Sequence, residues 1–277
     1  MQWLMLFRPV NVLMIGMTVI LGAYYVNRGV DFMFHKIFYL YVLGTMCIGA
    51  GGYVINDVFD VEIDKYNRPD TNIIGEKISV NVGYGISTFL FSLGLTFLYF
   101  THNLRVFLIG IIAVLSLYLY SKHFKKSLWI GNWIIALLAM LNVWIGGLYF
   151  FLSKHVLWMG AFAFLITLIR EMVKDMEDIY GDALGGAFTL PMLIGMEKMK
   201  EIIHFLCIIL IGLLLASLMF LEYNSIFIFV NVILVQIPLL YCLTLIYKAK
   251  YNEDFAQIST YLKIVMIGGM IMGMQLA

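Results

Sequence analysis

Long, unbroken apolar stretches are the feature that most constrains the fold of this chain. Nine of them occur along the 277 residues, each about long enough to cross a bilayer as a helix. They span residues 9–27, 37–56, 79–100, 104–121, 129–152, 156–174, 200–221, 225–247 and 258–275. Their apolar residues run continuously and do not alternate with polar ones, which favours helices over a β-barrel. We therefore predict an all-α integral membrane protein with nine transmembrane helices.

The composition excludes several other classes of protein. Hydrophobic residues make up 62% of the chain and charged residues only 13%, against roughly 25% charged in a soluble domain. The net charge of +1, without a basic run, predicts no nucleic-acid partner. Cys47, Cys207 and Cys242 lie in apolar stretches and are expected to be buried thiols, not disulfide or zinc ligands. Residues 1–277 are expected to form a single domain whose first segment stays in the membrane as a helix.

The basic residues predict an orientation in the membrane. One side carries the N-terminus and the loops after the second, fourth, sixth and eighth helices. It holds 14 of the 18 Lys and Arg residues, with Lys263 counted among the loop charges of that side. By the positive-inside rule this side is cytoplasmic. We expect a multi-pass protein of the plasma membrane.

Two acidic clusters lie on that same side, and their spacing is the same. The first comprises Asn56, Asp57, Asp60 and Asp64, and the second comprises Asp175, Asp178 and Asp182. In each cluster the aspartates follow one another at intervals of three and four residues, so a continuous helix would carry each cluster within an arc of about 100°. Carboxylates beside a bilayer are costly, and like charges repel unless cations compensate them. The alternative, a solvated acidic helix end, fits one cluster better than two. The pair indicates a site for Mg²⁺ and a diphosphate.

The residues around both clusters resemble a known family. The stretch from Asn56 to Asp70, NDVFDVEIDKYNRPD, resembles the first aspartate-rich signature of the UbiA-type intramembrane prenyltransferases. The stretch from Arg170 to Pro191, REMVKDMEDIYGDALGGAFTLP, resembles the second. The segments at Arg8–Asn11, Tyr120–Ser121, Lys125–Lys126 and Gly131–Asn132 are similar to shorter family motifs. The resemblance covers essentially the whole chain and implies a central cavity with an active site at the cytoplasmic side.

The resemblance also implies roles for individual residues. Asn56, Asp60 and Asp64 are expected to hold one Mg²⁺, and Asp178 and Asp182 another, while Asp57 and Asp175 orient ligands or water. Diphosphate-binding candidates are Arg68, Lys125, Lys126 and Lys174, joined by Arg8, Asn11 and Tyr120. The two adjacent lysines are alternatively interfacial anchors, and Tyr120 alternatively belongs to an aromatic belt.

The second stretch is most similar to family members that add a second geranylgeranyl chain to a glycerol-phosphate ether lipid. The expected reaction is Mg²⁺-dependent transfer of a prenyl group from its diphosphate to the hydroxyl of a prenylglyceryl phosphate, with Asp175 or the released diphosphate as proton acceptor. An aromatic acceptor such as 4-hydroxybenzoate is the alternative. A cation transporter is the rival from another class, but transporter acids sit near the midplane and not at helix ends. The sequence predicts no oligomeric state.

Overall fold

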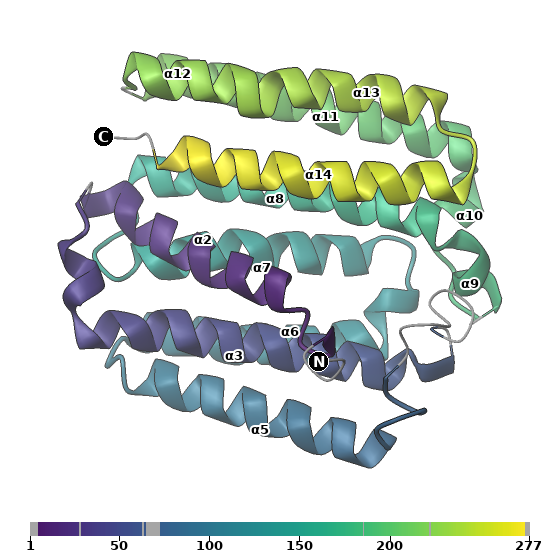
Figure 1. Ribbon diagram of the computed structural model, residues 1–277, viewed down its shortest axis with the longest axis horizontal. Coiled ribbons are helices and arrows are strands. Elements are labelled where there is room, and N and C mark those ends of the chain that lie inside the picture. Colours follow the sequence, from purple (N-terminus) through teal and green to yellow (C-terminus); the bar gives the residue numbers. More distant parts are fainter. Residues whose placement is uncertain are drawn as a thin grey trace.

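The structure is a computed structural model that describes residues 5–27, 29–62, 64, 73–184, 186–221 and 223–274. Within these residues it contains nine helices long and apolar enough to span a membrane, which lie roughly side by side (Figure 1). The predicted all-α membrane fold is therefore confirmed. The extended pairing among the described residues is a single bridge between Ile74 and Ile78.

The spans follow the apolar stretches closely. The first seven are single helices: α2 (Pro9–Asn27), α3 (Lys36–Phe59), α5 (Val80–Tyr99), α6 (Leu104–Lys122), α7 (Ile130–Gly147), α8 (Lys154–Glu177) and α11 (Met196–Phe220). The eighth, Ser225–Lys248, joins α12 (Ser225–Asn231), a π-helical turn η3 (Val232–Gln236) and α13 (Ile237–Lys248), and the ninth is α14 (Asn252–Gly273). Short helices connect them: η1 (Asp31–Phe34), η2 (Phe124–Lys126), α9 (Ile179–Leu184) and α10 (Leu190–Ile194).

The helices pack into two groups. Buried side chains of α8, α11, α13 and α14 form one apolar cluster, and those of α3, α5 and α6 form the other. Helices α2 and α7 contribute to both clusters and lie between the groups in Figure 1. Helices α2 and α7 thus join the two groups, which come from the two halves of the chain.

Helices α2 and α7 approach each other closely because glycine occupies the crossing. A Cβ atom added to Gly22 would collide with the carbonyl oxygen of Val143, and one added to Gly146 would collide with that of Val19. Small residues at such crossings let membrane helices pack backbone to backbone. This contact fixes α2 against α7 and sets the position of Arg8, just before α2.

The predicted start of the last helix, residue 258, is wrong, and so is the counting of Lys263 among the loop charges, although the predicted span 258–275 already contains it. Helix α14 begins at Asn252 because Asp254 caps it: its Oδ2 accepts hydrogen bonds from the backbone N–H groups of Lys250 (2.8 Å) and Tyr251 (3.0 Å). Lys263 therefore lies 11 residues inside the helix, about 16 Å along its axis. It is a charge within a membrane span and not a loop charge.

Candidate active site

The first acidic cluster lies where α3 ends. Asp60 follows the last residue of α3 and is only 2% exposed. Its Oδ2 accepts a hydrogen bond from Asn56 Nδ2 at 2.6 Å and forms an ion pair with Lys125. The chain then continues in a helical turn, since the N–H of Asp64 donates to the carbonyl oxygen of Asp60 at 2.8 Å. The cluster is thus held by its own backbone and by a lysine from η2.

The second cluster lies where α8 ends. Asp178 follows the last residue of α8, and the N–H of Asp182 in α9 donates to its carbonyl oxygen at 2.9 Å. One turn earlier, Asp175 Oδ2 accepts a hydrogen bond from Asn132 Nδ2 of α7 at 2.7 Å. Neither acidic cluster is carried by one continuous helix, as the predicted arcs assumed, because each helix ends at the middle aspartate.

Lys125 connects the two clusters. Backbone hydrogen bonds tie its loop to the segment after the second cluster, from Phe188 N to Lys126 O (3.2 Å) and from Leu190 N to Leu128 O (3.0 Å). Burial alone lowers the pKa of Lys125, but Asp60, and after it Asp64 and Asp182, raise it above its usual value. The lysine is therefore a fixed ammonium group that faces carboxylates of both clusters.

The electrostatics of Asp182 show how closely the carboxylates are gathered. Burial raises its pKa to about 6; Lys125 opposes this shift, while Asp178 and Asp60 add to it. A cation beside these groups would relieve the repulsion between them.

Arg8 closes the site from the start of α2. Its backbone has a φ of +47°, which a non-glycine residue rarely adopts. From there its guanidinium group forms an ion pair with Asp57 and lies 5.0 Å from the centre of the Tyr53 ring. Burial lowers the pKa of Arg8, but Asp57 and the other carboxylates raise it above its usual value.

A cavity of about 380 Å³ opens between the two helix groups, within the range of small-molecule sites. Its lining on α8 extends from Met159 to Asp178, about 28 Å along the helix. One end carries the acids and bases described above, and the rest is mainly apolar, with Ile48, Ile145 and Phe162 among its residues. The cavity therefore has the form of a long apolar groove with a charged end.

Most of the predicted site residues lie on this cavity wall. They are Arg8, Asn11, Asn56, Asp60, Asp64, Tyr120, Lys125, Lys174 and Asp178. The wall position of Tyr120 favours a role in the site over the aromatic belt. Asp57, Asp175, Asp182 and Lys126 are not on the wall, and the side chain of Lys126 is exposed. Arg68 lies outside the described residues.

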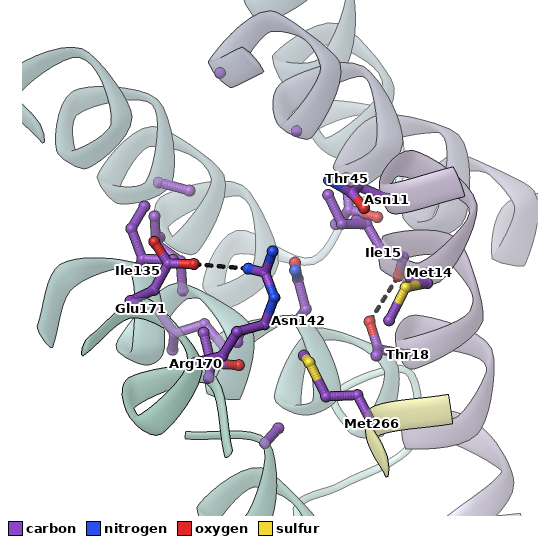
Figure 2. A pocket seen from close by; sticks show the side chains of 18 of the residues that line it. Asn11, Met14, Ile15, Thr18, Thr45, Ile135, Asn142, Arg170, Glu171 and Met266 are labelled. Atoms are coloured by element: carbon purple, nitrogen blue, oxygen red, sulfur yellow. Dashed lines mark hydrogen bonds and ion pairs between the residues drawn. The ribbon is translucent and has the colours of Figure 1, made fainter. Parts of the chain in front are cut away.

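The cavity also contains polar residues that were not predicted as site residues. They are Thr18, Thr45, Tyr53, Asn142, Thr167, Arg170, Glu171 and Lys263. Figure 2 shows Arg170 and Glu171 of α8 joined by an ion pair, with Asn11, Ile15 and Thr18 of α2 on the other side of the cavity. Arg170 and Lys263 could have been found from the sequence, because an ionisable residue inside a membrane span usually has a function. Both were instead counted with the loop charges that predict the orientation.

The donor groups fit a hard divalent cation. Among the described residues, no three His, Cys, Asp or Glu side chains converge to complete a metal site. Mg²⁺ does not require one, because it typically binds one or two carboxylates and completes its shell with water and phosphate oxygens. Asn56 Oδ1 is buried beside Asp60 without a hydrogen-bond partner, which leaves an acceptor oxygen for a cation. The residues at the charged end therefore fit Mg²⁺.

Comparison with known proteins gives consistent matches over most of the chain. A digeranylgeranylglyceryl phosphate synthase of Saccharolobus solfataricus is 38% identical over 228 residues, 81% of this chain and 79% of the relative. One from Methanosphaera stadtmanae is 33% identical over 273 residues, 94% and 93% of the two chains. A solved structure from work on digeranylgeranylglyceryl phosphate synthase in membranes superposes with a TM-score of 0.74 at 29% sequence identity. The match covers 99% of this chain and 96% of that one.

More distant structures share the fold. The structure of a UbiA homolog from Archaeoglobus fulgidus bound to DMAPP and Mg²⁺ has a TM-score of 0.72 at 18% identity. The match covers 97% of this chain and 99% of that one. The UbiA prenyltransferase family itself matches residues 15–267, nearly the full length. Two aspartate clusters at one end of a long apolar cavity and this match lead to the same result: the chain belongs to the UbiA prenyltransferase family.

Proposed function

We propose that this protein transfers a geranylgeranyl group from its diphosphate to the free hydroxyl of geranylgeranylglyceryl phosphate, and releases diphosphate. The observation that carries the proposal is the meeting of both aspartate clusters, through Lys125, at one end of a long apolar cavity. That arrangement suits a substrate with an anionic head and an apolar tail. The names of the relatives, digeranylgeranylglyceryl phosphate synthases, support the choice of acceptor.

In this proposal Mg²⁺ is the cofactor. Asn56, Asp60 and Asp64 would hold one ion, and Asp178 and Asp182 another, as the resemblance to the family implies. Such ions would neutralise the charge of the diphosphate as it leaves. The partner-less Asn56 Oδ1 supports the first of these sites. Solved structures of a UbiA homolog from Archaeoglobus fulgidus bound to DMAPP and Mg²⁺ or to GPP and Mg²⁺ support the choice of metal.

The chain's basic residues bind the diphosphate. Lys125 and Lys174, both on the cavity wall, offer ammonium donors to its oxygens, and Arg8 offers a guanidinium group. Asp57 holds Arg8 in place through their ion pair. Arg68 and Lys126 remain candidates for the same anion.

The bond changes follow from this placement. The allylic C–O bond breaks, and its electron pair leaves with the diphosphate. The hydroxyl oxygen of the acceptor then bonds to the allylic carbon. Its proton passes to the released diphosphate, because Asp175 lies off the cavity wall with its Oδ2 bonded to Asn132. The apolar wall keeps water from the allylic carbon and binds the prenyl chain, whose remote binding energy positions the reacting end.

We further propose that the charged end faces the cytoplasm, in the plasma membrane, with residues 1–277 acting as one unit. The described basic residues support this orientation. Ten of them lie at the helix ends or in the loops on the side of the acidic clusters, against three on the other side, Lys36, Arg105 and Lys154. The ten are Arg8, Lys77, Lys122, Lys125, Lys126, Lys174, Lys198, Lys200, Lys248 and Lys250. Such an excess marks the cytoplasmic side.

A turnover assay tests the function. The purified protein in nanodiscs receives radiolabelled geranylgeranyl diphosphate with geranylgeranylglyceryl phosphate or 4-hydroxybenzoate, with Mg²⁺ or with EDTA. Label transfer to the glycerol lipid, lost in EDTA and restored by added Mg²⁺, is the expected result. Transfer to 4-hydroxybenzoate alone keeps the mechanism but overturns the acceptor. If no label is transferred to either acceptor and the protein conducts Mg²⁺ in proteoliposomes, the prenyltransferase proposal is overturned and the protein is a transporter.

A further inference from the structure

Two basic residues line the cavity well below its charged end. Arg170 precedes Asp178 by eight residues on α8, about 12 Å along the helix axis. Lys263 lies about 16 Å inside α14, measured from the end that begins beside the acidic clusters. Both are on the wall of the same cavity. Neither belongs to the aspartate clusters or to the residues assigned to the donor diphosphate.

The two side chains point towards a similar level along the length of the cavity. Helices α8 and α14 pack against each other and run in opposite directions (Figure 1). Side chains on a helix lean towards its N-terminus. Arg170 therefore leans away from the charged end, and Lys263 leans towards it. The guanidinium and ammonium groups are brought to a similar level of the cavity.

Arg170 has hydrogen-bonding capacity to spare. Its Nη1 donates to Glu171 Oε1 at 2.8 Å, which uses one of the five N–H donors of a guanidinium group. Its Nε is buried and has no partner. The side chain is only 15% exposed, so water does not replace the missing acceptor readily. Figure 2 shows the arginine reaching into the cavity with this ion pair on one side.

The charge at this level favours an anion. Cations within a membrane span are costly and are retained where they have a partner or a function. Arg170 and Lys263 place two such cations on the wall of this cavity. An unpartnered guanidinium N–H, on a cavity wall that a second cation also lines, suits a group with several acceptor oxygens. A phosphate monoester is such a group, and arginine binds it in a bidentate manner.

We propose that Arg170 and Lys263 form a subsite for the phosphate group of the lipid acceptor, separate from the site for the donor diphosphate. The inference rests on the proposed function, in which the acceptor is a prenylglyceryl phosphate. The acceptor's reacting hydroxyl must approach the allylic carbon beside the aspartates, whereas its phosphate is on another glycerol carbon. A second cationic group, offset from the first along the cavity, is what such a molecule requires.

The subsite would also select the acceptor. A prenylglycerol without phosphate leaves the buried Nε–H of Arg170 unpaired, and a site built for a polar group rejects an analogue that lacks it. The phosphate thus contributes to recognition and orientation, while the chemistry takes place at the hydroxyl.

The test compares two acceptors, geranylgeranylglyceryl phosphate and its dephosphorylated alcohol, in the wild type and in Arg170→Gln, Arg170→Lys and Lys263→Gln. We expect the two Gln substitutions to lower kcat/KM for the phosphorylated acceptor by roughly tenfold to a hundredfold, mainly through KM. The loss with the alcohol should be much smaller, and Arg170→Lys should recover part of the activity. Lys248→Gln, an exposed lysine outside the cavity, is the matched control.

The outcomes separate the two proposals. A wild type that does not use the phosphorylated lipid overturns the proposed function. A wild type that uses it, with variants that lose both acceptors equally or lose affinity for the donor diphosphate instead, overturns only the phosphate subsite. If Arg170→Gln fails to fold, Lys263→Gln decides the question from the other helix.

Discussion

Asp60 and Asp178 occupy the same backbone position in two different helices. Each follows the last residue of a span, with φ and ψ of −95° and 2° for Asp60 and −90° and 3° for Asp178. Each N–H donates to the residue four before, and each carbonyl oxygen accepts from the aspartate four after. The equal spacing in the sequence thus corresponds to an equal local structure: a helix end at the middle aspartate, followed by one further turn.

This equivalence predicts that the two aspartates contribute alike. Asp60→Asn and Asp178→Asn each keep the side-chain shape but remove a charge that we assign to Mg²⁺ binding. We expect each to lower kcat by at least about a hundredfold, on the scale of losing a major electrostatic contact, and to raise the Mg²⁺ concentration needed for half-maximal rate. Mg²⁺ titrations of the turnover rate measure both effects. Asp31→Asn, in η1 at the opposite end, should stay near the wild-type rate.

Lys125 and Lys126 are neighbours that the structure separates. Lys125 forms an ion pair with Asp60 on the cavity wall, whereas Lys126 is exposed and off the wall. Lys125→Gln should lower kcat/KM for the prenyl diphosphate by roughly tenfold to a hundredfold, the value of a hydrogen bond to a charged group. Lys126→Gln should change it by less than about threefold, as an interfacial lysine would. Equal losses in the two variants would contradict this assignment and return Lys126 to the diphosphate site.

The sequence predicts the spans well because a bilayer requires long apolar stretches and little else. It also predicts the acidic clusters, whose spacing needs no knowledge of the neighbouring helices. The partners of these acids could not be predicted in the same way. The pairing of Asp57 with Arg8 joins residues 49 positions apart, and that of Asp60 with Lys125 joins residues 65 apart. Such contacts depend on how helices pack, which no local pattern specifies.

The polar residues deeper in the cavity were missed for another reason. Arg170 and Lys263 lie inside the predicted spans 156–174 and 258–275, yet the count of basic residues on each side of the membrane places both with the loop charges. The cap formed by Asp254 starts α14 six residues earlier than predicted, so Lys263 lies deeper in the span than the predicted start implies. Hydropathy alone underestimates helices that begin with capped polar residues.

The ion pair between Arg8 and Asp57 predicts an indirect role for an acid off the cavity wall. Asp57→Asn should weaken prenyl diphosphate binding because Arg8 loses the partner that positions it, and Arg8→Gln should weaken it directly. The double variant should then lose little more than Arg8→Gln alone, since both substitutions disrupt one unit. Dissociation constants for a non-hydrolysable diphosphate analogue would measure this coupling. Strictly additive losses would show that Asp57 acts independently of Arg8.

The crossing of α2 and α7 predicts a stability effect that is separate from chemistry. Gly146→Ala places a methyl group against the carbonyl oxygen of Val19, where only backbone surrounds it. We expect a loss of about 1–3 kcal/mol in the free energy of unfolding, because the helices must move apart. Gly212→Ala, in α11 with no atom within 4 Å of the added Cβ, is the matched control. Its change should stay within about 1 kcal/mol and be stabilising, since alanine favours a helix over glycine. Unfolding of both variants in the same detergent measures the difference, and an equal response would contradict the close crossing.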